Sequence, residues 1–271
     1  MRREWKKPAV LLAHALAFTA IVATPAHATS ILYSTSFESP PFVGGAIAGQ
    51  DGWNVFGPGL STVTNVFAKT GVRSVGLNGG AASQTGPWHG DLSAGPLVEL
   101  SADIAISTSS TQTSWQFGAT GPNLIQYLGG IDVAANNDIL LITAGFPVVG
   151  KFPRANPFDQ AGWHHVDALF NIGTQRYDIS LDGVLLGSNI PFCGSNAGCT
   201  GAAVANYGSG IFDGFGGVPG GNDVAFMDNF QVVNVTAAVP EPCSLVLLGV
   251  GLISSRAVRR RKQRNTRRSA R

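Results

Sequence analysis

Few side chains in the central part of the chain have the types and spacing that glycan chemistry requires. Hydrolysis of a glycosidic bond uses two carboxyl groups, one of which stays protonated as a general acid. Between residues 29 and 239 the only glutamates are Glu38 and Glu99. Pairs of aspartates remain an alternative, but no motif favours a particular pair. The sequence also has no Gly-x-Ser-x-Gly turn and no His-Glu-x-x-His zinc helix. We therefore expect a protein that is not an enzyme.

The sequence does not predict a metal site formed by the histidines. His164 and His165 are neighbours in an expected strand, so their side chains point to opposite faces and cannot chelate one metal together. His89 follows Trp88 in an expected loop, where it could line a sugar site, although a packing role is favoured. Large aromatic side chains mostly belong to cores. We therefore assign no residue to sugar binding.

Two of the three cysteines are expected to pair with each other. Cys193 and Cys199 are separated by five residues, and in the periplasm we expect them to form a disulfide that closes a small loop. Free thiols or half of a metal site are the alternatives, but no third or fourth soft ligand lies nearby in sequence. Cys243 belongs to an apolar C-terminal segment and is expected to pack there, with lipidation or processing as the alternative.

The charge of the chain is distributed unevenly. Residues 29–239 contain 14 Asp and Glu but five Lys and Arg, which is a formal net charge of −9, whereas the whole chain has +2. An acidic surface disfavours binding to the phosphate backbone of nucleic acids. It is compatible with divalent cations or neutral glycans.

The elements that must position these side chains are strands. Apolar and polar residues alternate in residues 97–107, 163–171, 176–181 and 224–233, and Asp182-Gly183 is a hairpin signal. No long pattern with a period of 3.6 residues is present, and glycines separate short apolar runs. Residues 29–238 are therefore predicted to form one antiparallel β-sandwich domain.

Two groups of residues resemble known sandwich families. The run from Gly162 to Asp167, followed by Tyr177 to Gly183, is similar to the hairpin of laminin-G-like and concanavalin-A-like sandwiches. Residues 36–38 with 49–53, and residues 227–232, resemble the first and last strands of carbohydrate-binding jelly rolls. The resemblance implies that Glu38 on the first strand and Asp228 on the last hold a structural calcium ion, for which carboxylate oxygens are suitable ligands. The alternative is that both are exposed carboxylates at strand ends.

The same resemblance bears on catalysis. Glycoside hydrolases of the concanavalin-A-like type carry a Glu-x-Asp-x-x-Glu or Glu-x-Asp-x-Glu cluster. This sequence contains neither.

The N-terminus has the features of a secretory signal peptide. A basic segment, residues 1–7, precedes an apolar stretch, residues 8–26, and the sequence Ala26-His27-Ala28 follows. We expect residues 1–28 to pass through the export translocon and signal peptidase to cut after Ala28. A permanent membrane anchor is the alternative.

The C-terminus combines three features in a fixed order. Pro240-Glu241-Pro242 comes first, a mostly apolar stretch from Cys243 to Ser255 follows, and an Arg-rich cluster begins at Arg256. The stretch is shorter than the roughly 20 residues that span a bilayer, but flanking residues and local thinning extend its reach. The basic cluster is expected to remain cytoplasmic. A soluble core helix and a nucleic-acid-binding tail are the alternatives, and neither explains an apolar segment that is followed only by charge.

This order of features resembles the tails of PEP-CTERM proteins of Gram-negative bacteria. In that family the tail is a sorting signal that a membrane protease, exosortase, recognises and is thought to cleave near Pro-Glu-Pro. The resemblance implies that Pro240, Glu241 and Pro242 form the recognition element, that residues 239–264 include a hydrophobic helix in the inner membrane, and that residues 265–271 are a basic tail.

These observations predict an exported surface or extracellular-matrix protein that is non-catalytic and binds glycans or adheres to them. Transient anchoring in the inner membrane would precede arrival at the cell surface or release, and extracellular polysaccharide is the expected partner. A secreted glycan-active enzyme is one alternative. An ice-binding protein is another, although it would need flat Thr-rich repeats that the sequence lacks.

Overall fold

The structure is a computed structural model, and it describes residues 29–58, 60–78, 86–90, 92, 94–106, 114–124, 126–136, 138–143, 148–152, 162–192, 206–215 and 223–236. The part from Thr29 to Val235 forms one unit. Sixteen strands are described, with one short 3-10 helix, η1 (Pro122–Leu124). The strands are β1 (Thr29–Thr35), β2 (Gly45–Ala46), β3 (Trp53–Phe56), β4 (Ser61–Thr64), β5 (Ser74–Asn78), β6 (Gly86–His89), β7 (Leu97–Ile106), β8 (Ser114–Thr120), β9 (Tyr127–Val133), β10 (Ile139–Thr143), β11 (Val148–Phe152), β12 (His164–Asn171), β13 (Arg176–Leu181), β14 (Val184–Pro191), β15 (Ser209–Phe215) and β16 (Val224–Val235).

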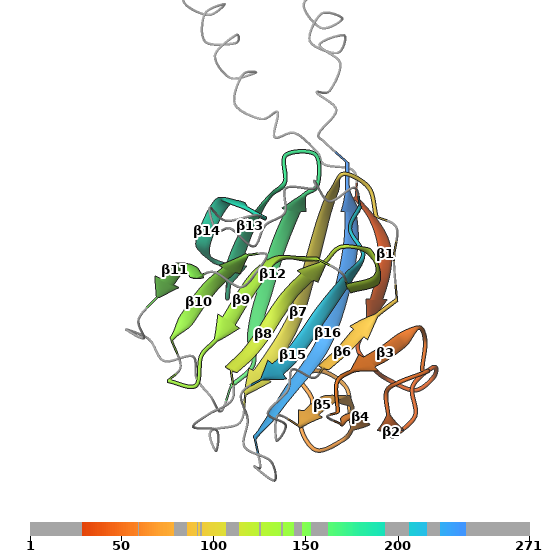
Figure 1. The fold of residues 1–271 in the computed structure, drawn as a ribbon. Coiled ribbons are helices and arrows are strands. Elements are labelled where there is room, and N and C mark those ends of the chain that lie inside the picture. Colours follow the sequence, from red (N-terminus) through yellow and green to blue (C-terminus); the bar gives the residue numbers. More distant parts are fainter. Residues whose placement is uncertain are drawn as a thin grey trace, which may run out of the picture. The chain divides into compact units, whose positions relative to one another are not determined.

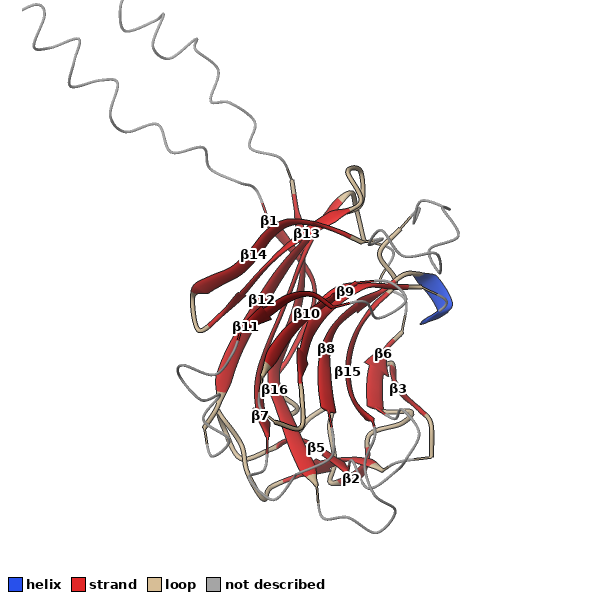
Figure 2. Cartoon of the chain, turned by 60° about the vertical axis from the view of Figure 1, so that its left-hand side comes forward, coloured by secondary structure: helices blue, strands red, loops and turns tan. Residues whose placement is uncertain are grey.

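The strands form two antiparallel sheets that stack as separate layers (Figures 1 and 2). The nine-stranded sheet has the order β14-β13-β12-β7-β16-β5-β4-β2, and β1 also pairs with β16. The seven-stranded sheet has the order β11-β10-β9-β8-β15-β6-β3. This arrangement is an all-β antiparallel sandwich, as the alternating sequence pattern predicted.

The core lies between the sheets and is rich in aromatic rings. Trp53, Phe117, Phe170 and Phe230 are fully buried, and Phe170 stacks on Tyr177 with ring centroids 5.6 Å apart. Each large apolar side chain that is fully buried contributes about 1.5–3 kcal/mol to the free energy of unfolding. Because every second residue of a strand faces this core, the residues between them must face outward.

One edge of β16 is shared by two strands. Val224 to Met227 pair with β5, whereas Phe230 to Val235 pair with β1. The pairing of β16 with β7 on its other edge shifts register between Asp228 and Gln231, and Asn229 has a positive φ of 48°. Such a bulge lets a strand change its twist and its partner. The junction between β5 and β1 therefore lies at Asp228 and Asn229.

Most predicted strands are confirmed within a few residues, because they correspond to β7, β12, β13 and β16, and the Asp182-Gly183 turn joins β13 to β14. The first strand was placed wrongly. It comprises Thr29–Thr35, and it ends before Phe37, whose φ of 59° is incompatible with an extended strand. The prediction of a loop at His89 was also wrong, since His89 is the last residue of β6.

Among the described residues no helix is both long and apolar enough to cross a bilayer. The predicted hydrophobic C-terminal helix lies outside the described residues.

Candidate functional site

The outward face of the nine-stranded sheet is polar at its centre. On β7 the side chains of Val98, Leu100, Ala102 and Ile104 are buried in the core. The alternating residues Glu99, Ser101 and Asp103 therefore project from the opposite face.

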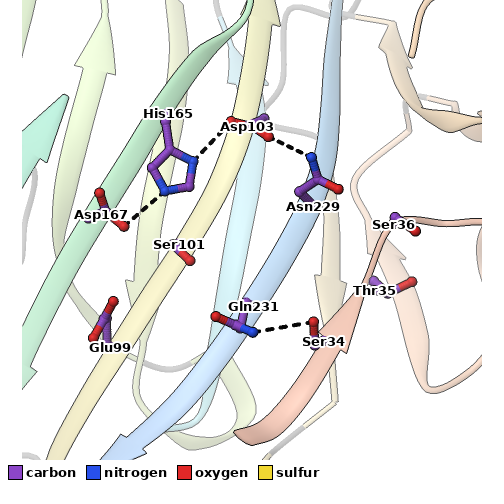
Figure 3. A pocket seen from close by; sticks show the side chains of 10 residues that line it. All are labelled: Ser34, Thr35, Ser36, Glu99, Ser101, Asp103, His165, Asp167, Asn229 and Gln231. Atoms are coloured by element: carbon purple, nitrogen blue, oxygen red, sulfur yellow. Dashed lines mark hydrogen bonds and ion pairs between the residues drawn. The ribbon is translucent and has the colours of Figure 1, made fainter. Parts of the chain in front are cut away.

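Strand register brings polar residues from distant parts of the chain beside these three. Ser101 pairs with Asp167 on β12 and with Gln231 on β16, and Gln231 pairs with Ser34 on β1. Asp167, Ser101, Gln231 and Ser34 thus form one row across four strands. His165 pairs with Asp103 and begins a second row, which Asn229 continues (Figure 3).

The two rows form the floor of a pocket of about 580 Å³. All of its lining side chains are polar: Ser34, Thr35, Ser36, Glu99, Ser101, Asp103, His165, Asp167, Asn229 and Gln231. The pocket therefore offers hydrogen-bonding groups on a rigid sheet, without an aromatic surface for stacking.

His165 lies between two carboxylates. Its Nδ1 is 2.9 Å from Asp103 Oδ1 and its Nε2 is 3.0 Å from Asp167 Oδ1. Partial burial lowers the pKa of His165, but the hydrogen bond to Asp103, the charges of both aspartates and the hydrogen bond to Asp167 outweigh it, so the pKa is raised. Both ring nitrogens are occupied, and the imidazolium form is favoured.

Asn229 continues this network toward β16. Its Nδ2 donates to Asp103 Oδ2 at 2.7 Å, and its Oδ1 accepts a hydrogen bond from the Thr70 hydroxyl at 2.7 Å. Both oxygens of Asp103 are therefore engaged. The bulge in β16 is what turns the Asn229 amide toward Asp103.

Ser101 and Glu99, on β7, keep their hydrogen-bonding capacity free within the described part of the chain. Ser101 is only 7% exposed, yet its hydroxyl forms no hydrogen bond there. Glu99 likewise has no hydrogen-bond or ion-pair partner among the described residues. Because both residues line the pocket, these groups are available to a ligand or to water.

Glu38 and Asp228, the predicted calcium ligands, hold the same loop from two sides. Asp228 Oδ2 accepts the backbone N–H groups of Lys69 and Thr70 at 2.9 and 3.0 Å. Glu38 Oε1 accepts those of Val72 and Arg73, both at 2.8 Å. These four amides belong to residues 65–73, the β4–β5 loop.

This geometry suits amide capture better than calcium coordination. The second oxygen of Asp228, Oδ1, accepts the N–H of Asn229 at 2.7 Å. Calcium requires six to eight oxygen ligands, but no group of three or more His, Cys, Asp or Glu residues is arranged to hold a metal in the described ranges. The calcium prediction gains no support from this arrangement.

The surroundings of Asp228 shift its ionisation. Burial raises the pKa of its carboxyl group, the three amide hydrogen bonds act in the opposite direction, and the negative charge of Asp103 adds to the rise.

Gly71 is required in the loop, because its φ is +63° and a Cβ atom there would clash with Glu38 Oε1.

Other predicted site residues fall outside the described ranges. These are the cleavage residue Ala28, the expected disulfide partners Cys193 and Cys199, and the sorting residues Pro240, Glu241 and Pro242.

The two neighbouring histidines do point to opposite faces, since His164 contacts Asp182 whereas His165 lines the pocket. His89 packs against Tyr33, with ring centroids 3.9 Å apart, as the packing interpretation expected.

Sequence reasoning missed the pocket. It assigned His165 to the sandwich signature and gave no role to Glu99, Ser101, Asp103 or Asp167. The available signal was the run of polar residues at alternate positions on two strands that both have an apolar second face. The register between strands places these residues beside Asn229 and Ser34. This register cannot be read from the sequence.

Comparison with known proteins gives two findings. Residues 238–262 match the PEP-CTERM protein-sorting motif. The chain therefore carries this motif, which indicates export, processing by exosortase and sorting through the membrane to the cell surface. No curated protein sequence matches the chain significantly.

The chain is similar to several solved structures. A Bacillus subtilis protein of unknown function with a galectin-like fold aligns with a TM-score of 0.51 and 12% identity, over 78% of this chain and 99% of that one. A sialidase aligns with a TM-score of 0.48 and 13% identity, over 77% of this chain but 18% of the sialidase. The endo-β-1,4-glucuronan lyase of the fungus Trichoderma reesei aligns with a TM-score of 0.47 and 13% identity, over 78% and 99%. At such identities the likeness shows the fold alone.

Proposed function

We propose that this chain is a non-catalytic, glycan-binding protein of the cell surface or extracellular matrix, and that its ligand lies in the polar pocket on the nine-stranded sheet. Its tail would hold it in the inner membrane until exosortase acts near Pro240, Glu241 and Pro242. The sorting motif supports the route, and the pocket supports the binding role.

The observation that carries the proposal is the free hydroxyl of Ser101 on the floor of an otherwise fixed polar pocket. Hydroxyl, amide and carboxylate groups are the partners that sugar hydroxyls need. Their positions are set by paired strands, so binding requires little ordering of the protein.

The state of His165 supports binding in preference to turnover. A general base must have a nitrogen open toward the substrate. Both nitrogens of His165 are engaged by aspartates, and Asp103 is engaged on both oxygens. His165 thus has no nitrogen free to act as a general base in this arrangement.

The test measures binding and turnover on one sample. The full-length chain would be titrated calorimetrically with polysaccharide purified from the producing bacterium, and new reducing ends would be counted afterwards. We expect saturable binding without new ends. Ser101→Val should weaken binding about fivefold, because one hydrogen bond contributes about 1 kcal/mol.

Thr62→Val is the matched control, because Thr62 projects from the same sheet outside the pocket. Equal weakening by both substitutions, or binding that neither changes, would place the ligand elsewhere. Formation of new reducing ends would reject the non-catalytic role.

A second candidate, a glycan-active enzyme, is favoured by one observation on the other sheet. Asp213, Gln116 and Asp132 pair in register on β15, β8 and β9. The two aspartates are two strands apart, so their Cα atoms are separated by about 10 Å. Burial raises the pKa of Asp132 to about 7, within the range suited to a general acid near neutral pH.

Single substitutions distinguish the two candidates. For the enzyme, Asp132→Asn and Asp213→Asn would each abolish the formation of reducing ends while Ser101→Val would spare it. For the binding protein, no reducing ends form in any variant.

A further inference from the structure

The free anionic oxygens of the pocket lie on one side of it. Asp103 is engaged on both oxygens, but Asp167 uses only Oδ1, in its contact with His165. Glu99 has no partner among the described residues. The open anionic oxygens thus belong to Glu99 and Asp167.

Ser101 lies between these two carboxylates (Figure 3). Asp167 is directly opposite Ser101 on the neighbouring strand, which places the two Cβ atoms about 5 Å apart. Glu99 is two residues from Ser101 on the same face of β7, a distance of about 7 Å. Ser101 is only 7% exposed, and its hydroxyl, which has no hydrogen-bond partner among the described residues, faces the pocket at the centre of an acceptor-rich corner, which we call the acidic corner.

The opposite side of the pocket is neutral. Asn229 and Gln231 on β16, with Ser34 on β1, provide amides and a hydroxyl, which both donate and accept. Gln231 Nε2 approaches Ser34 Oγ at 3.5 Å, so this side remains adjustable. Among the described residues no lysine or arginine lines the pocket, and the imidazolium of His165 is held between Asp103 and Asp167.

This asymmetry defines a ligand. A primary ammonium group has three donors and no acceptor, and the acidic corner offers two carboxylates and a hydroxyl as three acceptors. Hydroxyl groups of the same ligand match the neutral side. A sugar ring that carries an unacetylated amine has both features.

We propose that the acidic corner binds the ammonium group of an amino sugar, so that the pocket selects polysaccharides containing free hexosamine amines over acetylated or acidic ones. This inference rests on the proposed glycan-binding function and adds the class of glycan. A charge-assisted hydrogen bond is about twice as strong as a neutral one, whereas N-acetylation removes the charge and two of the donors.

The test compares three oligosaccharides of equal length. Oligomers of glucosamine, N-acetylglucosamine and glucuronic acid would be titrated into the full-length chain at pH 6.5 and low salt. We expect the glucosamine oligomer to bind at least about tenfold tighter than the acetylated one, with affinity that falls as salt rises, and no binding of the glucuronic acid oligomer.

Two pocket variants and one control attribute the preference to the acidic corner. Glu99→Gln and Asp167→Asn each remove one negative charge, and Asn can still accept from His165 through its oxygen. Each substitution should bring the ratio of the affinities for the glucosamine and N-acetylglucosamine oligomers close to one. Asp51→Asn makes the same charge change at an exposed turn outside the pocket, with a φ of 45° that Asn tolerates, and should preserve the preference.

The possible results distinguish the preference for amino sugars from glycan binding itself. Equal binding of free and acetylated oligomers would overturn the inference while the glycan-binding function stands. A preference that survives the Glu99→Gln, Asp167→Asn double substitution would assign it to the acidic surface in general and also overturn the inference. Polylysine binding as tightly as the glucosamine oligomer would point to a basic peptide partner instead, and absence of binding by every glycan would refute both.

Discussion

The imidazole of His165 lies between Asp103 and Asp167, so its protonation changes the charge of the pocket near neutral pH. A raised pKa means that the folded protein stabilises the protonated form. That stabilisation is complete below about pH 6.5, the ordinary value, and is lost as pH rises through the higher pKa of the folded state.

His165→Gln should therefore destabilise the protein more at pH 6 than at pH 9. The ring faces Asp103 on β7 and Asp167 on its own strand, and 44% of its side chain is exposed to solvent. Solvent screening limits the difference to less than about 1 kcal/mol. Urea unfolding at the two pH values measures it, and an equal loss at both would refute the protonated arrangement.

Asp132 shows the opposite dependence. Burial raises its pKa to about 7, and its Oδ1 has no hydrogen-bond partner in the described ranges. An acid whose folded pKa is raised begins to destabilise the fold at pH values where the unfolded chain ionises it but the folded protein keeps it protonated. The penalty is absent below about pH 4, grows as pH rises to about 7, and is constant above that value.

Asp132→Asn should thus stabilise the protein more at pH 8 than at pH 4.5, by a difference on the order of 2–3 kcal/mol. The cost of burying an amide is the same at both pH values and cancels in the comparison. The exposed Asp51→Asn is the control and should show no such trend. A constant effect across this range would mean that Asp132 is already ionised in the folded state.

At the scale of elements, the junction where β16 changes partner depends on two carboxylates. β5 and β1 meet the same edge of β16, and the β4–β5 loop is held there by Asp228 and Glu38 through four backbone amides. Hydrogen bonds to a charged group contribute about 1.5–3 kcal/mol each. The loop is therefore part of the sheet junction rather than a free surface segment.

The two carboxylates should respond differently to amide substitution. Both backbone amides held by Glu38 bond to one of its oxygens, so Glu38→Gln can keep both hydrogen bonds. It should lower the free energy of unfolding by less than about 1 kcal/mol. Asp228 accepts hydrogen bonds on both oxygens, so Asp228→Asn must lose at least one of them. It should lower the free energy of unfolding by about 2–3 kcal/mol. Chemical denaturation compares them, and an equal cost would show that the amide contacts do not govern the junction.

How much of the fold and of the pocket could be predicted depends on how far along the chain each sequence pattern extends. Alternation within ten residues predicted β7, β12, β13 and β16, because period two is a local property. The pocket was not predictable, since Ser34, Ser101, Asp167 and Gln231 become neighbours only through register between strands that are far apart in sequence. The bulge at Asp228 and Asn229, which sets that register, has no local sequence signature.

The fate of the whole molecule is the subject of the last prediction. Residues 238–262 carry the sorting motif, so the chain should be cut near it after export. Epitope tags placed after Thr29 and after Arg271 would be followed through inner membrane, cell surface and medium. We expect the front tag at the surface or in the medium without the rear tag. Both tags on one inner-membrane species would show that the tail is a stable anchor.

The pairing of β16 also determines how the domain bears mechanical load. β16 carries Asn229 and Gln231 in the pocket and ends a few residues before the sorting motif. A force applied between the pocket and the end of β16 would therefore pass along this one strand. Because β7 pairs on one edge and β1 on the other, such a pull shears two ladders of hydrogen bonds at once instead of unzipping them singly.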